Sequence, residues 1–334
     1  MVCVTYVDDC LFFAPNSANI DNMIQALCDD NYTLEIEDEV AGYLGVHLKH
    51  NDDKSIILTQ TGLIDRIIKA AGLEGANHST TPAETNPLGC DKDGIPYSGT
   101  FSYASLVGML KYLAGHSRPD IAFSVHQCAR FTFAPKASHA EALKRIVRYL
   151  IGTKDKGYTL RQPDNINVDC YVDADFAGLW SSENRLDSSS VKSRSGFIIL
   201  MVGAHISWFS KLQTEIALSA FEAEYVALST SMRKLIPFLD ILVEVCSGVS
   251  FTPSISTTSK STVWEDNEAC EKLDLHITPR SKHFGIKYHW FREKLVHRNI
   301  SVEYIDTKLQ LADIFTKGLR SLRFQTLRKL IMGW

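Results

Sequence analysis

The chain has 334 residues, of which 22% are charged and 45% hydrophobic, and its formal net charge is −4. This composition is that of an ordinary globular protein with room for two or three domains. No apolar run approaches the ~20 residues of a membrane span and the N-terminus lacks a signal-peptide pattern, so we expect an intracellular protein, in the nucleus or a cytoplasmic particle, without membrane contact. The eight cysteines form no C-x-x-C pair, which argues against a disulfide framework or a zinc site.

Positive charge is concentrated in two stretches of this acidic chain. Residues 280–334 contain twelve Lys/Arg against four Asp/Glu, and residues 130–161 contain eight against two. Such stripes indicate a polyanion track beside a carboxylate-rich site, although solvated helix faces explain runs of this kind about as often.

The first 100 residues predict an α+β segment followed by a linker. Apolar residues run up to Asp8 and Asp9 and away again in MVCVTYVDDCLFFA, a pattern of either an ordinary turn or a metal-binding polymerase hairpin. The elements expected next are a helix at 20–28, strands near 32–36, 43–49 and 56–59, and a helix at 63–71. Residues 79–100 are rich in Thr, Pro, Gly and Asp, which is typical of a linker.

The rest of the chain predicts helices first and then a sheet. Helices are expected at 103–113, from Pro119 to 131, and at 142–150 behind a Ser138-x-x-Glu141 capping box. The elements expected after them are strands at 166–173, 196–201 and 205–210, a helix at 217–235, a strand at 261–265, a short helix, a helix at 282–296, a strand at 301–305 and a last helix from 310. This order predicts a mixed five-stranded sheet flanked by helices.

Acidic residues occur at the ends of several of these elements. Asp173 ends the first strand, with Asp175 as its competitor, and Glu224 lies at the margin of the apolar stripe of the long helix. Asp266 follows a strand and Asp313 lies in the first helical turn, where an N-cap and the helix dipole are ordinary structural explanations. Each acid alone is more often structural. The order Asp–Glu–Asp–Asp on these elements favours a two-metal phosphodiester site, whose carboxylates converge within ~4 Å of a shared point.

Nine stretches together make the chain resemble the C-terminal part of the Pol polyprotein of copia-type LTR retrotransposons. They are YVDD, YLGVHLK, YASLVGMLKYLAGHSRPDIAFSV, HAEALKRIVRYLIGT, YVDADFAG, KSRSGFIIL with ISWFSKLQTEIALSAFEAEYVALS, EDNEAC, RSKHFGIKYHWFRE and QLADIFTKGL. One such match is weak, but nine in family order are specific. The resemblance implies a partial reverse-transcriptase palm and thumb (1–78), a linker and helical connection (79–161) and a ribonuclease H-like domain (162–334).

For the polymerase, the resemblance makes Asp8 and Asp9 two of three metal-binding aspartates. The third belongs to a strand upstream, so we expect this chain to be the back part of something larger and to have no polymerase activity alone. The expected protein partner is the upstream reverse-transcriptase portion or another Pol subunit.

For the ribonuclease H, the resemblance implies cleavage of the RNA strand of RNA–DNA hybrids. Asp173 is expected to bridge two Mg²⁺ ions, with Mn²⁺ as an alternative metal; Glu224 and Asp266 complete one ion's shell and Asp313 contributes to the other. The cations expected to contact nucleic acid are Lys282, Lys287, Lys294, Arg298 and Lys308.

Two departures from the family leave rival interpretations open. Thr307 and Lys308 stand where some ribonucleases H have a mobile histidine, and the stretch between Asp266 and Arg280 is short. The alternative to an active nuclease is therefore an inactive retroelement remnant that only binds nucleic acid. An integrase-type strand transferase is disfavoured, because it requires two aspartates followed by a glutamate and an upstream zinc motif.

Overall fold

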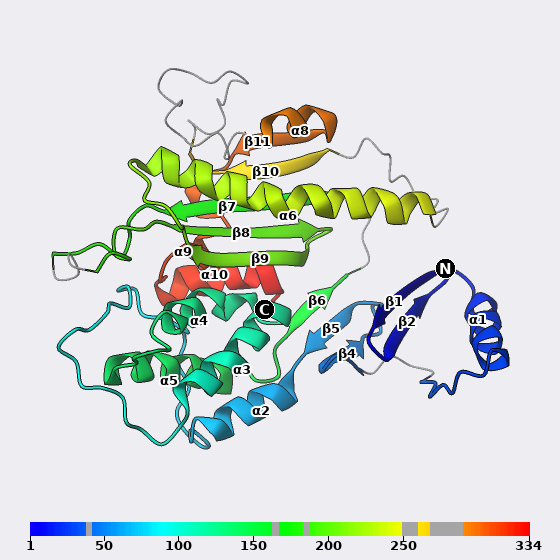
Figure 1. Ribbon diagram of the computed structural model, residues 1–334, viewed down its shortest axis with the longest axis horizontal. Helices are drawn as coiled ribbons and strands as arrows, with labels where there is room; N and C mark the ends of the chain where they lie inside the picture. The colour runs from blue at the N-terminus through cyan, green and yellow to red at the C-terminus, as the bar shows by residue number, and fades with distance from the viewer. Residues whose placement is uncertain (38–41, 162–166, 183–186, 249–259, 268–289) are drawn as a thin grey trace.

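The computed structural model describes residues 1–37, 42–161, 167–182, 187–248, 260–267 and 290–334 (Figure 1). A five-stranded sheet with the long helix α6 (Ala220–Gly248) along one face forms the upper part of Figure 1, and a group of shorter helices lies below it. Two hydrophobic cores lie on the two faces of this sheet.

The sheet has the strand order β11-β10-β7-β8-β9 and mixed strand directions. β7, β8 and β9 form an antiparallel meander, while β10 runs parallel to both β7 and β11. The strands are β7 (Val168–Asp175), β8 (Arg194–Met201), β9 (Ala204–Leu212), β10 (Ser261–Glu265) and β11 (Ile300–Tyr304). The predicted mixed five-stranded sheet with flanking helices is therefore confirmed.

Strand β8 reads as a continuous apolar run because both of its faces are covered. Phe197 and Ile199 belong to the core beneath α6, whereas Ile198 and Leu200 belong to the core on the opposite face. This alternation follows from the two-residue period of a strand. The central strand is thus fixed from both sides, which gives its neighbours a rigid reference.

The second core joins segments from both halves of the sequence. Its helices are α2 (Thr61–Ala70), α3 (Tyr103–His116), α4 (Ala122–Ala129), α5 (Ala137–Ile151) and α10 (Ser321–Met332). Leu327 and Ile331 of α10 are buried among residues of α2 to α5, and Trp334 Nε1 donates to the carbonyl oxygen of Gly157 at 2.6 Å. Apolar packing therefore crosses the expected boundary at residue 162.

The predicted capping box at the start of α5 is wrong. The helix begins at Ala137, and the backbone N–H of Lys136 donates to Nδ1 of His139 at 3.0 Å. Ser138 lies inside the first turn, and its hydroxyl donates to Asp91 instead. A contact to a residue distant in sequence thus replaced the local cap.

The N-terminal region contains a hairpin, a helix and a small second sheet. The hairpin is β1 (Val2–Tyr6) with β2 (Asp9–Phe13), and α1 (Ser17–Asp29) follows. The second sheet has the order β3-β4-β5-β6, with β3 (Gly42–Tyr43), β4 (Val46–His50), β5 (Ile56–Thr59) and β6 (Tyr158–Leu160). The strand expected at 32–36 is wrong: this segment has no regular structure and its apolar side chains are exposed.

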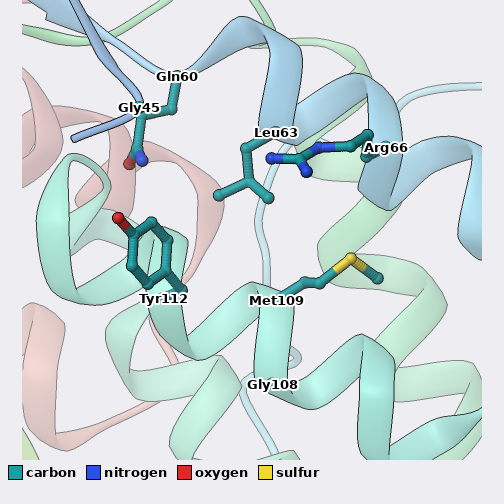
Figure 2. A pocket seen from close by; sticks show the side chains of 7 residues that line it. All are labelled: Gly45, Gln60, Leu63, Arg66, Gly108, Met109 and Tyr112. Carbon is teal, nitrogen blue, oxygen red and sulfur yellow. The ribbon is translucent and has the colours of Figure 1, made fainter. Parts of the chain in front are cut away.

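A cavity of about 390 Å³ lies between α2 and α3 (Figure 2). It is lined by Gly45, Gln60, Leu63, Arg66, Gly108, Met109 and Tyr112. None of these residues is acidic, so the cavity is separate from the carboxylates that the sequence singles out.

No described helix combines the length and the apolar character that crossing a bilayer requires.

Candidate active site

The predicted acids lie at the edge of the sheet where β7 and β10 end. Because these two strands are parallel, their carboxyl ends meet at the same edge. Asp173 is near the end of β7 and only 2% exposed, and Asp266 directly follows β10. Strand direction alone therefore brings two of the predicted acids together.

Glu224 reaches this edge from α6, whose start is fixed by local hydrogen bonds. The Ser219 hydroxyl accepts from the backbone N–H of Glu222 at 3.1 Å, and Glu222 Oε2 accepts from the backbone N–H of Leu218 at 2.7 Å, in the manner of a capping box. One helical turn later Glu224 is buried. Glu222 thus serves as a cap.

Three of the four predicted acids form one compact group. Asp173, Glu224 and Asp266 each offer a carboxylate oxygen, and these oxygens all lie within 4.8 Å of one another. Among the residues that the structure describes, none forms a hydrogen bond with the buried Glu224 Oε2. Such a set of oxygen donors is suited to a hard divalent cation.

Asp313 lies beside this group but is held by cations. It is the first residue of the short helix α9 (Asp313–Thr316), and its Oδ1 is 2.8 Å from Lys317 Nζ while its Oδ2 is 2.9 Å from Arg323 Nη2. Lys317 Nζ is also 3.6 Å from Asp173 Oδ2. Asp313 is therefore connected to the acidic group through an ammonium.

The predicted single helix from residue 310 is wrong. The segment is broken into shorter pieces, and this break brings two cations to Asp313. The segment consists of a 3₁₀ turn η3 (Thr307–Leu309), then α9, then α10. A Cβ on Gly318 would lie 2.0 Å from the carbonyl oxygen of Glu84, so the chain between α9 and α10 passes directly against another backbone. The resulting break places Lys317 and Arg323 around Asp313.

Burial controls the protonation of the acidic group. It is the largest cause that raises the pKa of Asp173 to about 7; Asp313 and Asp266 raise it further, while Lys317 and the Thr316 hydroxyl oppose the rise. Burial, followed by the charges of Asp173 and Asp266, also raises the pKa of Glu224 well above its ordinary value. A bound cation would relieve this repulsion between carboxylates.

Glu265 is a fifth acid that the sequence reasoning missed. It is fully buried, and burial followed by the charge of Glu224 raises its pKa well above the ordinary value. The alternation in STVWE could have revealed it, because Ser261, Val263 and Glu265 are the buried positions of β10. A second, fully buried carboxyl group thus lies next to Glu224.

Asp175 does not join the group. The prediction that the strand stops at Asp173 is wrong, because β7 continues to Asp175, which pairs with Arg194. A Cβ on Gly178 would lie 1.7 Å from Asp175 Oδ2, so this carboxylate is directed toward the turn after the strand. Asp173 is therefore the better ligand of the two.

Gly196 pairs with Asp173 in the β7–β8 register and lets α9 approach the sheet at this point. A Cβ here would lie 2.7 Å from Thr316 Cγ2 and 2.8 Å from Phe315 Cβ. We expect Gly196→Ala to push α9 outward, to lower the free energy of unfolding by about 1–3 kcal/mol and to reduce any activity of the acidic site by about a hundredfold. Denaturant unfolding and a cleavage assay check this, and Gly203→Ala, at the β8–β9 turn with φ 75°, is the control for a strained glycine away from α9.

The predicted nucleic-acid-binding cations are only partly described. Lys282 and Lys287 lie outside the described residues, as does most of the short stretch after Asp266. The described cations are exposed: Lys294, Arg298, which forms an ion pair with Asp240 at 2.6 Å, and Lys308. The backbone carbonyl of Lys308 accepts from Arg323, so Lys308 lies close to the acidic edge.

Asp8 and Asp9 form part of the expected hairpin. Tyr6 pairs with Asp9, and Val7 at the turn has a φ of 53°. Both aspartates are exposed, and within the described ranges no third metal-ligating residue joins them. The hairpin is confirmed, whereas its role in metal binding stays a prediction.

No protein-family profile matches the chain. It is 29% identical over 324 residues, 96% of its length, to the retrovirus-related Pol polyprotein from transposon RE1 of Arabidopsis thaliana, and it spans 21% of that relative. It is 30% identical over 237 residues to the putative transposon Ty5-1 protein of Saccharomyces cerevisiae, covering 69% of this chain and 72% of that one.

Among solved structures, the foamy viral protease-reverse transcriptase dRH in complex with ds DNA matches with a TM-score of 0.50 at 14% identity, covering 91% of this chain and 46% of that one. This likeness concerns the fold. The sequence similarity extends over nearly the whole chain and includes a relative covered over most of its length. The chain therefore belongs to the copia-type, retrovirus-related Pol polyproteins.

Proposed function

We propose that this chain carries a ribonuclease H that uses divalent metal, preferably Mg²⁺, to hydrolyse the RNA strand of RNA–DNA hybrids. The observation that carries the proposal is the meeting of Asp173, Glu224 and Asp266 within 4.8 Å at one edge of the sheet. These residues are far apart in sequence, and three separate elements are needed to bring them together. Membership of a Pol family supports the same class of chemistry.

The donor set fits a magnesium or manganese ion. All three side chains offer oxygen, and no residue in the described part of the chain competes for the buried Glu224 Oε2 through a hydrogen bond. When bound, such an ion supplies Lewis acidity and lowers the pKa of a bound water. Asp173, Glu224 and Asp266 would hold it.

The protein's own residues would orient the nucleic acid. The Thr316 hydroxyl donates to Asp173 Oδ2 and fixes the carboxylate that lies between Glu224 and Asp313. Exposed Lys294, Arg298 and Lys308 are suited to phosphate contacts, which give salt-dependent affinity. Selection of RNA would come from contacts to 2′-hydroxyls in the minor groove. The double-stranded DNA bound by the foamy viral protein supports a duplex as the partner.

We propose no polymerase activity for this chain alone. Asp8 and Asp9 are an exposed pair, and two carboxylates do not organise a template, a primer and an in-line transfer. The assignment of 1–78 to palm and thumb, 79–161 to a connection and 162–334 to the nuclease is part of this proposal. The upstream reverse-transcriptase portion or another Pol subunit remains the proposed protein partner.

A remnant that binds but does not cleave is the second candidate. It is favoured by the two cations on Asp313, at 2.8 and 2.9 Å, because they occupy a carboxylate that the nuclease hypothesis assigns to metal.

Cleavage of a defined hybrid distinguishes the two candidates. We expect the purified chain with Mg²⁺ to cut the RNA strand of an end-labelled RNA–DNA hybrid, and to leave double-stranded DNA and single-stranded RNA intact. EDTA should stop the reaction, and Glu224→Gln, prepared in parallel, should lack it, which excludes a contaminating nuclease. Binding of the hybrid by the wild type without cleavage would establish the remnant.

A further inference from the structure

We propose that Lys317 is the second positive centre of this nuclease site, its ammonium remaining between Asp173 and Asp313 so that the site takes a single divalent ion. This inference rests on the proposed ribonuclease H function and specifies how its site is charged. It departs from the two-ion arrangement that the family resemblance implies.

The contacts divide the acidic edge into two unlike halves. On one side Asp173, Glu224 and Asp266 present oxygens within 4.8 Å of one another. On the other side Lys317 Nζ lies 2.8 Å from Asp313 Oδ1 and 3.6 Å from Asp173 Oδ2. The first half is suited to a divalent ion, whereas the second already contains a cation bound by both carboxylates.

The backbone around Lys317 is fixed on both sides. Before it, Thr316 and Phe315 pack against Gly196, and the Thr316 hydroxyl donates to Asp173. After it, Gly318 lies against the backbone of Glu84 so closely that an added Cβ would be 2.0 Å from the carbonyl oxygen. The backbone N–H of Lys317, the residue that ends α9, also donates to the carbonyl oxygen of Asp313 at 3.3 Å. Tertiary packing thus fixes the backbone on either side of Lys317, and the two ion pairs hold its ammonium.

The balance of charge favours one divalent ion. With the fully buried Glu265 neutral, Asp173, Glu224, Asp266 and Asp313 carry four negative charges when ionised, and Lys317 and Arg323, which form ion pairs with Asp313, offset two of them. One divalent ion neutralises the remaining two. A second would leave an excess of positive charge and would lie against a fixed ammonium, where like charges repel strongly.

The Lys317 ammonium is paired with two carboxylates, at 2.8 Å from Asp313 Oδ1 and 3.6 Å from Asp173 Oδ2, and it still reaches solvent. Its side chain is still 38% exposed, so a phosphate can reach it.

The ammonium would stabilise the charge that develops on the scissile phosphate. In the hydrolysis, a water oxygen forms the new bond to phosphorus, the water proton passes to solvent, and the bond from phosphorus to the 3′ oxygen breaks. The 3′ oxygen leaves with the electron pair and takes a proton from solvent. Lys317 donates hydrogen bonds to the phosphoryl and leaving oxygens and forms no covalent bond.

Binding of Mn²⁺ to the full chain tests the inference without an activity assay. Asp8→Asn/Asp9→Asn serves as the background, so that the hairpin does not contribute. We expect calorimetry to count one Mn²⁺ that is lost in Asp173→Asn, and electron paramagnetic resonance to show no coupled pair. In Lys317→Met a second Mn²⁺ should bind, with the spin coupling of ions about 4 Å apart. A spin-coupled pair of Mn²⁺ ions in the protein that retains Lys317 would overturn the proposal. This outcome does not depend on whether the Lys317→Met variant folds.

The magnesium dependence of cleavage provides a second measurement. Lys317→Met should lower the cleavage rate about a hundredfold at low Mg²⁺. At high Mg²⁺ its rate should recover, with the steeper dependence on Mg²⁺ concentration that two ions produce. Lys317→Arg should keep the dependence expected for one ion. A two-ion dependence in the wild type would contradict the inference. If the wild type does not cleave at all, the proposed function fails, and the Mn²⁺ count still decides the role of Lys317.

Discussion

Replacing Asp173 with Asn should lower the rate of RNA-strand cleavage by about a thousandfold, while Asp175→Asn should keep most of it. Asp173 belongs to the proposed ligand group with Glu224 and Asp266 and also forms an ion pair with Lys317. Its loss would therefore affect both the proposed divalent ion and the Lys317 ammonium. The interactions of such a cation with a phosphoryl group are worth several kcal/mol, which corresponds to about three orders of magnitude in rate. Single-turnover cleavage of an RNA–DNA hybrid measures the difference.

Asp175→Asn is a matched control, because it makes the same change two residues along the same strand. Melting curves of both variants show whether either loss comes from unfolding. If Asp175→Asn were inactive and Asp173→Asn active, the ligand assignment would be reversed and the geometry of the proposed site abandoned.

Replacing Asp120 with Ala should lower the free energy of unfolding by about 3–5 kcal/mol, because it leaves a buried guanidinium without its carboxylate partner. Arg118 is fully buried, and its Nε and Nη2 donate to the two Asp120 oxygens at 2.9 and 2.8 Å. The Tyr149 hydroxyl donates to the same carboxylate at 2.6 Å. Arg118 also donates to Thr153, so this cluster ties the loop before α4 to the end of α5.

The double variant Arg118→Met/Asp120→Leu separates the cost of the stranded charge from the cost of lost packing. We expect it to recover much of the stability, since apolar replacements of a buried ion pair are often neutral or stabilising. Urea unfolding of the three proteins measures this. A loss below about 1 kcal/mol in Asp120→Ala would mean that water reaches Arg118 and that the pair is an ordinary surface interaction.

The parts of the site that depend on a single element could be predicted from sequence. Asp173 and Asp266 followed from strand ends at one sheet edge, and Glu224 followed from its place beside an apolar helical stripe. Lys317 could not be found in the same way, because its position depends on a helix break that an approach of Gly318 to Glu84 produces. The signal that was available is the four-residue spacing between Asp313 and Lys317.

The errors in the fold have a common physical origin. Local patterns favoured a strand at 32–36 and a cap at Ser138, but a strand needs a partner and the Ser138 hydroxyl found Asp91. Strand β6 has three residues, too few for a local signal, and exists because it pairs with β5 about a hundred residues earlier. The five-stranded sheet was predictable because both faces of its central strand are covered, which leaves a long apolar run.

The position of α10 has a consequence for the order in which this protein is made. Leu327 and Ile331 complete a core that begins at Leu63, and Trp334 reaches back 177 residues to Gly157. On the ribosome, helices α2 to α5 emerge long before the segment that covers them, so their apolar face stays exposed while the entire five-stranded sheet is synthesised. Chaperone binding to nascent chains should therefore persist until translation passes residue 332. Helices α2 to α5 and the five-stranded sheet should become protease-resistant together rather than one after the other.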